Sequence, residues 1–233
     1  MIVVLGTGQA SQHVQDELNA RGTKHVVLGR KHWSDKEELL GLIKDAQPHA
    51  VINCAAMRDI ALCDEDPQGA VEANVSLPDA ISSAGYRQVY ISTDYVFDLN
   101  HDNRILDENA VSKGALSTYG ATKLQGEKKV LDNDGIVVRI SSPFGPRKSP
   151  LKGSFPDFVA SSFNNLELPC DQHFKPSYMP DAAKAIVNVA MDMPPGIYHA
   201  VNEGTTDWAL YAKFIRETVK NKSKVVAVDR KST

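Results

Sequence analysis

The sequence predicts an α/β protein with a doubly wound, mostly parallel sheet and a small C-terminal lobe. Two observations predict this fold class: apolar, β-branched runs alternate with helical segments, and a glycine-rich turn directly follows the first run. The length of 233 residues suits one such domain with a small appended lobe. This Rossmann-type alternation is regular over residues 1–145. It weakens over 146–233, which we expect to form the lobe, interleaved with the end of the sheet.

The elements can be placed in order along the chain. Apolar runs predict strands at 1–6, 24–29, 49–56, 88–97 and 135–145. Helices are expected between them, at 9–21, 34–46, 66–85 and from 117 onward, the third of them interrupted by Pro78. Ser34, with Glu37 three residues later, has the pattern of a helix N-cap. Beyond the fifth strand we expect helices at 157–164, 181–191 and 208–220 and a strand at 197–201.

Composition excludes several classes of partner. The formal net charge is -3, so we expect no nucleic-acid partner and no membrane attachment. The 3 cysteines have no C-x-x-C spacing, which indicates reduced thiols. The first residues lack the basic leader of a signal peptide, and no apolar run reaches the length of a membrane span. These features predict a cytoplasmic protein. The sequence has no His/Cys cluster, so we expect no metal site.

The turn GTGQAS at 6–11 lies between the first strand and the first helix. Gly6 allows a tight turn, and Gly8 lets the backbone approach a pyrophosphate, which the amide groups of the helix N-terminus then face. Ser11 stands where the usual fingerprint has a third glycine. A G-x-G turn is also common as a plain connection, but its place in the first βαβ unit favours a dinucleotide site.

The segment LGRKHW ends the second strand without the acid that often holds the ribose hydroxyls of NAD. Arg30 and Lys31 stand there instead, and such cations can grip a 2′-phosphate. The alternative is a solvated basic turn, and Trp33 either stacks on adenine or packs under a helix. The missing acid and the two cations favour NADP (NADPH) over NAD, which stays an alternative.

Tyr119 and Lys123 lie one helical turn apart in STYGATK, at 117–123. A neighbouring ammonium and a nicotinamide ribose would favour the phenolate and bring the phenol into range for proton transfer. Ser92 and Thr93 add hydroxyls at the carboxyl end of the fourth strand, where doubly wound sheets bind ligands. Hydroxyl, phenol and ammonium together suit reduction of a carbonyl by hydride. The Y-x-x-x-K pair also occurs by chance in many helices, but the order of these motifs favours a catalytic role.

The chain resembles the extended short-chain dehydrogenase/reductases, and most closely the dTDP-4-dehydrorhamnose reductase branch, which reduces nucleotide-linked 4-keto sugars. The resemblance covers most of the chain in family order. Its segments are VINCAA (51–56), DEDPQGAVEAN (64–74), YISTDYVFD (90–98), LSTYGATKLQGEK (116–128), DQHFKPSYMPDAAKAI (171–186) and GIYHAVNEGTTDWALYAKFI (196–215). It implies an NADPH-dependent reductase of a nucleotide-linked 4-keto (deoxy)sugar, with an NAD(P)-binding domain over 1–145 and a substrate-binding lobe over 146–233.

The resemblance also implies roles for individual residues. Tyr119 would protonate the substrate oxygen, Lys123 would hold the ribose and lower the pKa of Tyr119, and Thr93 would hydrogen-bond the carbonyl. The residues implied to contact the cofactor are Gly6, Gly8, Gln9, Arg30, Lys31, Ala55, Ala56, Ser92 and Lys123. Those implied to contact the sugar are Thr93, Tyr95 and Ser142.

Two departures from the branch keep alternatives open. The lobe is shorter than usual, and Ser142, in RISSPFG (139–145), stands where the branch carries a tryptophan. One alternative is an NAD(P)-dependent sugar-nucleotide epimerase or dehydratase. Another is a non-catalytic, NADP-binding regulatory subunit, against which the intact set of Thr93, Tyr119 and Lys123 argues. Relatives are commonly dimers, so a homodimer is also an expectation.

Overall fold

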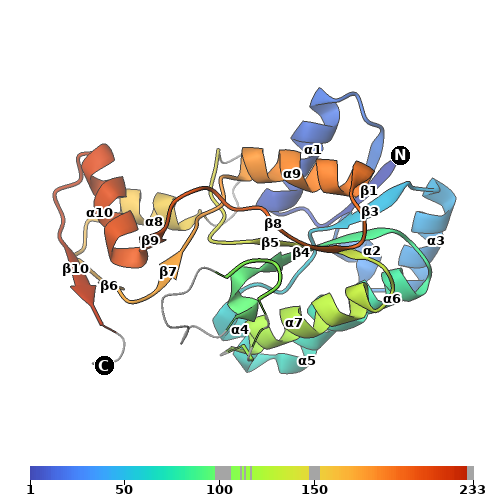
Figure 1. Cartoon of the computed structure of the whole chain (residues 1–233), viewed down its shortest axis with the longest axis horizontal. Helices are drawn as coiled ribbons and strands as arrows, with labels where there is room; N and C mark the ends of the chain where they lie inside the picture. The colour runs from blue at the N-terminus through green and yellow to red at the C-terminus, as the bar shows by residue number, and fades with distance from the viewer. Residues whose placement is uncertain (98–105, 111, 113, 116, 147–152, 230–233) are drawn as a thin grey trace.

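The computed structural model describes residues 1–97, 106–110, 112, 114–115, 117–146 and 153–229. There the α/β fold prediction is confirmed, with a central sheet of 6 parallel strands in the order β2-β1-β3-β4-β5-β8 (Figure 1). The strands are β1 (Ile2–Leu5), β2 (His25–Leu28), β3 (Ala50–Asn53), β4 (Gln88–Thr93), β5 (Ile136–Ile140) and β8 (Gly196–His199). β4 and β5 end earlier than the sequence predicts, and the residues beyond them turn away to build the site.

β1 lies between β2 and β3, so the chain first adds a strand on one side of β1 and then on the other. Leu5, at the end of β1, is paired with Leu28 of β2 and with Asn53 of β3. The carboxyl ends of the three strands therefore meet at one edge, at the point where the strand order reverses. In open α/β sheets this is where ligands bind.

Both faces of the sheet are buried, because alternate residues of each strand point to opposite sides. Ile2 and Val4 pack on one face, against α1 (Gln9–Ala20) and α9 (Met179–Asp192). Val3 and Leu5 pack on the other face with side chains of α3 (Lys36–Ala46) and α6 (Leu77–Ser83). Figure 1 shows α1 and α9 above the strands and α6 and α7 (Thr118–Leu131) below them.

The start of α3 differs from the prediction. Asp35, not Ser34, caps this helix, because its carboxylate accepts from the amides of Glu37 and Glu38, at 2.9 and 3.2 Å. The preceding residues form a short helical turn of their own, α2 (Arg30–Trp33). Ser34 ends this turn by donating its hydroxyl to the Arg30 carbonyl.

The segment predicted as one interrupted helix over 66–85 is preceded by α4 (Ile60–Glu65) and consists of α5 (Pro67–Val71), the π-helical turn η1 (Glu72–Ser76) and α6. Pro78 has no amide hydrogen to give to the carbonyl of Asn74, four residues earlier. The hydroxyl of Tyr90 on β4 donates a hydrogen bond to the Asn74 carbonyl instead, at 2.7 Å. The proline thus explains both the irregular turn and the cross-link from helix to sheet.

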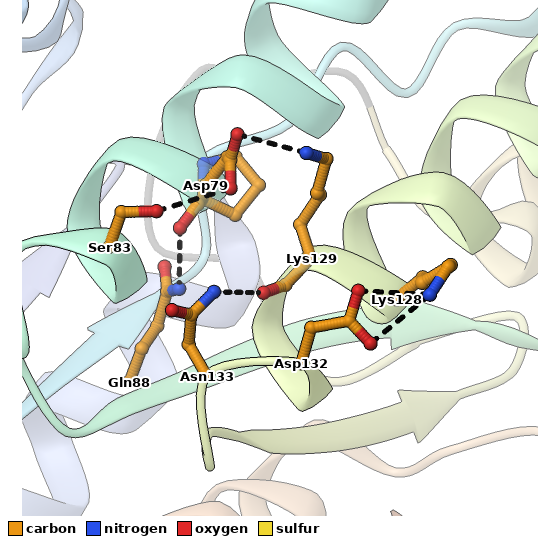
Figure 2. Close-up of polar contacts among 8 residues, drawn as sticks. Asp79, Ser83, Gln88, Lys128, Lys129, Asp132 and Asn133 are labelled. Atoms are coloured by element: carbon orange, nitrogen blue, oxygen red, sulfur yellow. Dashed lines mark hydrogen bonds and ion pairs between the residues drawn. The ribbon is translucent and has the colours of Figure 1, made fainter.

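α7 carries the Y-x-x-x-K pair and is fastened at several points. Ser117 caps its start by accepting from the Gly120 amide. Its far end is held to α6 by the ion pair of Lys129 with Asp79 at 3.3 Å, which Figure 2 shows beside the solvent-exposed pair of Lys128 with Asp132. These contacts make α7 a fixed support for the residues at its start.

α7 is also joined to the sheet by a buried ion pair. Glu127 accepts two hydrogen bonds from the guanidinium of Arg139 on β5, at 2.9 and 2.7 Å. Both side chains are at least 95% buried.

The C-terminal lobe has a small core of its own. It consists of α8 (Phe155–Ser161), α10 (Trp208–Thr218), the parallel pair β6 (Leu166–Pro169) and β10 (Val225–Val228), and the antiparallel pair β7 (His173–Phe174) and β9 (Thr206–Asp207). In Figure 1, α8 and α10 stand at one end of the molecule, while α9 and β8 belong to the main body. The boundary at residue 145 stays a prediction.

No helix among the described residues has the length and apolar character to cross a bilayer. No group of three or more His, Cys, Asp or Glu side chains among them could hold a metal ion.

Candidate active site at the carboxyl edge of the sheet

The glycine turn between β1 and α1 has the geometry expected of it. Gly6 has a φ of 99°, and a Cβ there would lie 3.1 Å from the carbonyl carbon of Cys54, so only glycine fits without strain. Beside Gly8, the residue before α1, no described atom lies within 4 Å of where a Cβ would be. Ser11 closes the turn from inside by donating its hydroxyl to the Gly6 carbonyl at 2.7 Å. The backbone at Gly8 therefore has free space in front of it.

The next residues border this space. Gln9 donates to the carbonyl of Gly145, beyond β5, at 3.5 Å. On the next strand, Ala55 is buried, and its amide donates to the Asn53 side chain at 3.0 Å, while Ala56 is partly exposed. The turn after β3 is thereby held in place.

The basic residues after β2 lie in the short turn α2. Arg30 and Lys31 are exposed, and the Arg30 guanidinium lies 5.8 Å from the ring centroid of Trp33, which packs against the core. Packing is thus the role that the contacts of Trp33 support. The sequence did not single out His32, whose Nδ1 accepts from the Gly29 amide at 3.1 Å and fixes the turn.

Thr93 and Tyr119 are brought together at the ends of β4 and α7. The Tyr119 hydroxyl hydrogen-bonds the Thr93 hydroxyl, and the Tyr95 ring meets the Tyr119 ring edge-on, with centroids 5.9 Å apart. Burial raises the pKa of Tyr119, the Thr93 bond lowers it, the Asp94 carboxylate raises it further, and Arg58 lowers it. The net shift is upward, so the phenol keeps its proton at neutral pH.

Lys123 lies deeper than the resemblance implies. Its Nζ donates to the carbonyl of Ile91 at 2.7 Å, lies 3.7 Å from the ring centroid of Tyr90, and belongs to a side chain only 1% exposed. Burial lowers its pKa to about 7, against the opposing effects of Glu127 and Cys54. Lys123 is not among the groups that shift the pKa of Tyr119 in this structure, so the implied lowering by Lys123 stays a prediction.

A close approach of α7 to the π-helical turn sets this depth. A Cβ on Gly126 would lie 2.0 Å from the Asn74 carbonyl oxygen and 2.7 Å from the Tyr90 hydroxyl. Asn74 is itself locked, since its amide donates to Thr122 at 3.1 Å and to the Met57 carbonyl at 2.9 Å. Glycine at 126 therefore lets α7 bring Lys123 onto the Tyr90 ring.

Three serines complete the edge. The hydroxyl of Ser92 is buried and has no hydrogen-bond partner in the described part of the chain. Ser142 is partly buried and has a φ of 37°, an uncommon backbone conformation for serine. Ser141 donates its hydroxyl to the Asp94 carboxylate at 2.5 Å.

Sequence reasoning missed Asp94 and Ser141 as parts of the site. A signal was present for both: Asp94 follows Thr93 directly in STDY, and Ser141 follows β5, the neighbour of β4 in a parallel sheet. Residues that follow adjacent parallel strands meet at the same edge. No comparable signal marks Tyr90 and Asn74, which meet only because of the proline-dependent turn.

The open glycine turn, the buried lysine and the hydroxyls around a protonated phenol define a nucleotide-binding α/β protein of the extended short-chain dehydrogenase/reductase class. The chain belongs to the RmlD substrate binding domain family, whose model matches residues 1–233. The predicted resemblance is thereby confirmed.

Relatives agree with this assignment. The dTDP-4-dehydrorhamnose reductase of Streptomyces griseus is 28% identical over 227 residues, covering 89% of this chain and 72% of that protein. Methionine adenosyltransferase 2 subunit beta of Rattus norvegicus is 38% identical over 117 residues, 48% of this chain and 34% of that protein. Among solved structures, dTDP-4-dehydrorhamnose reductase from Bacillus anthracis in complex with NADP has a TM-score of 0.88 at 24% identity, covering 99% of this chain and 84% of that chain.

Proposed function

We propose that the protein is an NADPH-dependent reductase of a nucleotide-linked 4-keto (deoxy)sugar, with Tyr119 as the proton donor. The observation that carries this is the placement of the phenol: Tyr119 lies beside Thr93 and Tyr95 at the carboxyl edge of the sheet, where open α/β sheets bind ligands. The Streptomyces griseus relative is a named reductase of this kind.

The residues present fit a dinucleotide. Gly6, Gly8 and Gln9 would hold the pyrophosphate, because the space at Gly8 admits close backbone approach. Ala55, Ala56, Ser92 and Lys123 would border the nicotinamide and its ribose, where the Ser92 hydroxyl lacks a partner among described residues. Arg30 and Lys31, exposed beside the turn, would hold a 2′-phosphate, which favours NADPH; NAD is the alternative.

NADPH supplies a hydride to the carbonyl carbon when bound. Tyr119 gives its proton to the carbonyl oxygen, and Thr93 and Arg58, which lower the pKa of Tyr119, stabilise the phenolate left behind. Tyr95, Thr93 and Ser142 would line the sugar, with lobe 146–233 as the outer wall of the cleft. We include a homodimer and a cytoplasmic location in the proposal, to be tested by sedimentation and by cell fractionation.

Fluorescence titration with NADPH and NADH, followed by nucleotide-linked 4-keto sugars, tests the proposal. We expect NADPH to bind more tightly and to be oxidised in proportion to one sugar. Tyr119→Phe should lose turnover by at least about a hundredfold, the usual contribution of a general acid, and keep NADPH binding. Tyr198→Phe is the matched control, because the carbonyl of Pro194 is the one partner of its hydroxyl among the described residues. Undiminished turnover in Tyr119→Phe would rule out this proton donor.

Arg30→Glu tests the choice of cofactor. Losing the cation that would hold the 2′-phosphate should shift preference toward NADH, by about tenfold for each ~1.4 kcal/mol of lost interaction. Lys24→Glu is the control, because Lys24 precedes β2 and so lies at the opposite end of that strand. An unaltered preference in Arg30→Glu would show that this residue does not contact the phosphate.

A second candidate is an NADP-binding subunit of another enzyme. It is favoured by the 38% identity, over 48% of the chain, with a protein named as a subunit of methionine adenosyltransferase 2. Tight NADPH binding without oxidation on any sugar would support this candidate over the reductase. Conversion of a sugar nucleotide without net NADPH consumption would indicate an epimerase.

A further inference from the structure

The ammonium of Lys123 lies against the face of an aromatic ring. Its Nζ is 3.7 Å from the ring centroid of Tyr90 on β4, well inside the range of about 6 Å over which a ring attracts a cation. The same nitrogen donates to the Ile91 carbonyl at 2.7 Å. The side chains of Lys123 and Tyr90 are at most 1% exposed, so bulk water does not weaken the attraction. A ring face and a carbonyl are therefore the close partners of a buried ammonium, which commonly pairs with a carboxylate.

The ring of Tyr90 is held in place independently of Lys123. Its hydroxyl donates to the Asn74 carbonyl at 2.7 Å, and the Asn74 side chain accepts from the Met57 amide at 3.0 Å. Val130 of α7 and Val137 of β5 pack with the ring in one buried cluster. The orientation of the ring face is therefore set by the surrounding fold.

Glu127 acts on Lys123 from one turn further along α7 and favours the ammonium. Both oxygens of its carboxylate, however, accept from the guanidinium of Arg139 on β5, at 2.9 and 2.7 Å. A carboxylate that is already paired attracts a second cation less, because the guanidinium repels that cation. Glu127 therefore does not replace the ring as the close partner of Lys123.

The other titratable groups around Lys123 are neutral. Burial raises the pKa of the Cys54 thiol, after β3, to about 12. Burial also raises the pKa of the Tyr119 phenol and that of the Tyr90 phenol. All three groups keep their protons at neutral pH, so Tyr90 attracts the ammonium through the electrons of its ring face and not through a charge.

We infer that Tyr90 is a positioning residue whose ring face, together with the Ile91 carbonyl, holds Lys123 as an ammonium at the dinucleotide site. This inference rests on the proposed reductase, in which Lys123 borders the nicotinamide ribose. An ammonium has three N–H groups, and these two neighbours engage at most two of them. The third stays available to a ribose hydroxyl. Tyr90 is fully buried and acts only through Lys123.

The ring face opposes the effect of burial on Lys123. Burial lowers the pKa of Lys123 to about 7. An attraction that exists only for the ammonium raises this pKa, because it stabilises the charged form. Weakening the ring face should therefore lower the pKa further and leave less of Lys123 charged at neutral pH.

Fluorinated rings at position 90 test this inference, because fluorine withdraws electrons from the ring face and changes the shape of the ring little. Tyr90→Phe is the reference, since it keeps the ring and loses the hydroxyl. Tyr90→difluorophenylalanine and Tyr90→trifluorophenylalanine then weaken the face in two steps. In protein labelled with 13C-lysine, the Lys123 resonance, assigned with Lys123→Met, reports protonation. We expect its titration midpoint to fall by about one pH unit from the reference to the trifluoro variant, with the difluoro variant between them.

Tyr198→Phe and Tyr198→trifluorophenylalanine are the matched controls on β8. The cation–π contacts of the described residues do not include the Tyr198 ring. Fluorination there should leave the titration midpoint of Lys123 unchanged.

The pH dependence of turnover is a second readout. An ammonium that holds the ribose positions the nicotinamide, so kcat/KM for NADPH should fall as pH rises through the midpoint of Lys123. This alkaline limb should move to lower pH by about one unit in the trifluoro variant. A purely structural role of Tyr90 would lower kcat/KM equally at all pH values and leave the limb in place.

The two measurements separate the inference from the function on which it rests. A Lys123 midpoint that stays constant along the ring series, or that rises, would overturn the inference whatever the activity. A wild-type protein that reduces no sugar would refute the reductase, while the NMR titration would still decide the role of the ring.

Discussion

Gly126→Ala is the substitution for which the structure gives the most definite expectation. The added Cβ would lie 2.0 Å from the Asn74 carbonyl oxygen and 2.7 Å from the Tyr90 hydroxyl, far inside van der Waals contact. Neither neighbour can yield easily, because the Tyr90 hydroxyl bonds the Asn74 carbonyl at 2.7 Å. α7 has to move away from η1, or this hydrogen bond has to break.

The magnitude follows from three contributions. Overpacking costs about 1–3 kcal/mol, and an unsatisfied buried carbonyl costs about 1–3 kcal/mol. The gain in helix propensity from glycine to alanine returns about 1 kcal/mol. We therefore expect Gly126→Ala to lower the free energy of unfolding by about 1–5 kcal/mol. At about 2–4 °C per kcal/mol for a chain of this size, Tm should fall by roughly 2–20 °C.

Gly41→Ala in α3 is the control, because no described atom lies within 4 Å of its Cβ position. It should raise the unfolding free energy by about 0.5–1 kcal/mol. Thermal unfolding followed by circular dichroism and urea titration measure both variants. A Gly126→Ala protein as stable as the wild type, beside a Gly41→Ala protein that behaves as expected, would refute the close packing of α7 on η1.

Two further stability predictions follow from buried charges. The pKa of Lys123 falls from 10.5 to about 7 on folding, so between these values the unfolded state binds the extra proton. The unfolding free energy should then rise with pH across that window, by at most about 1.4 kcal/mol per pH unit. Urea titrations at several pH values should show this rise in wild type. The same dependence of unfolding free energy on pH in Lys123→Met would contradict the assignment of the effect to Lys123. Glu127→Ala leaves the buried Arg139 guanidinium without its partner carboxylate and should lower the unfolding free energy by about 3–5 kcal/mol. Asp132→Ala breaks the exposed pair with Lys128 and should lower it by less than about 1 kcal/mol in the same urea assay. Equal losses of unfolding free energy in the two variants would refute the buried pair.

The sequence predicted the parts of the fold that depend on local pattern. The β-branched runs placed the first five strands, and glycine spacing placed the turn before α1. Helix starts were less predictable, because Ser34 and Asp35 are both good caps and only the extra turn α2 decides between them. The strands of the C-terminal lobe were not predicted, since β7 and β9 are only two residues long and carry no periodic signal.

The site was predictable where one motif carries it. STYGATK and STDY placed Tyr119 and Thr93 at the same edge, and the structure brings them into contact. The burial of Lys123 was not predictable, because it depends on Tyr90, on Asn74 and on the missing amide hydrogen of Pro78. Nor was the upward pKa shift of Tyr119, which comes from burial and from Asp94. Such contacts join residues distant in sequence, and no spacing rule reports them.

The place of α9 in the main body has a consequence for protein synthesis. The face of the sheet that includes Ile2 and Val4 is completed by α9, whose Ile186 and Val187 are fully buried against it. A ribosome that has translated β1 to β5 still has to add the chain up to Asp192, which takes roughly 2–10 s at about 5–20 residues per second. During that interval the nascent chain presents an uncovered apolar face, a binding surface for chaperones. Messages truncated before α9 should therefore yield chains that aggregate or are degraded, although they encode the whole glycine turn and both the STDY and STYGATK motifs.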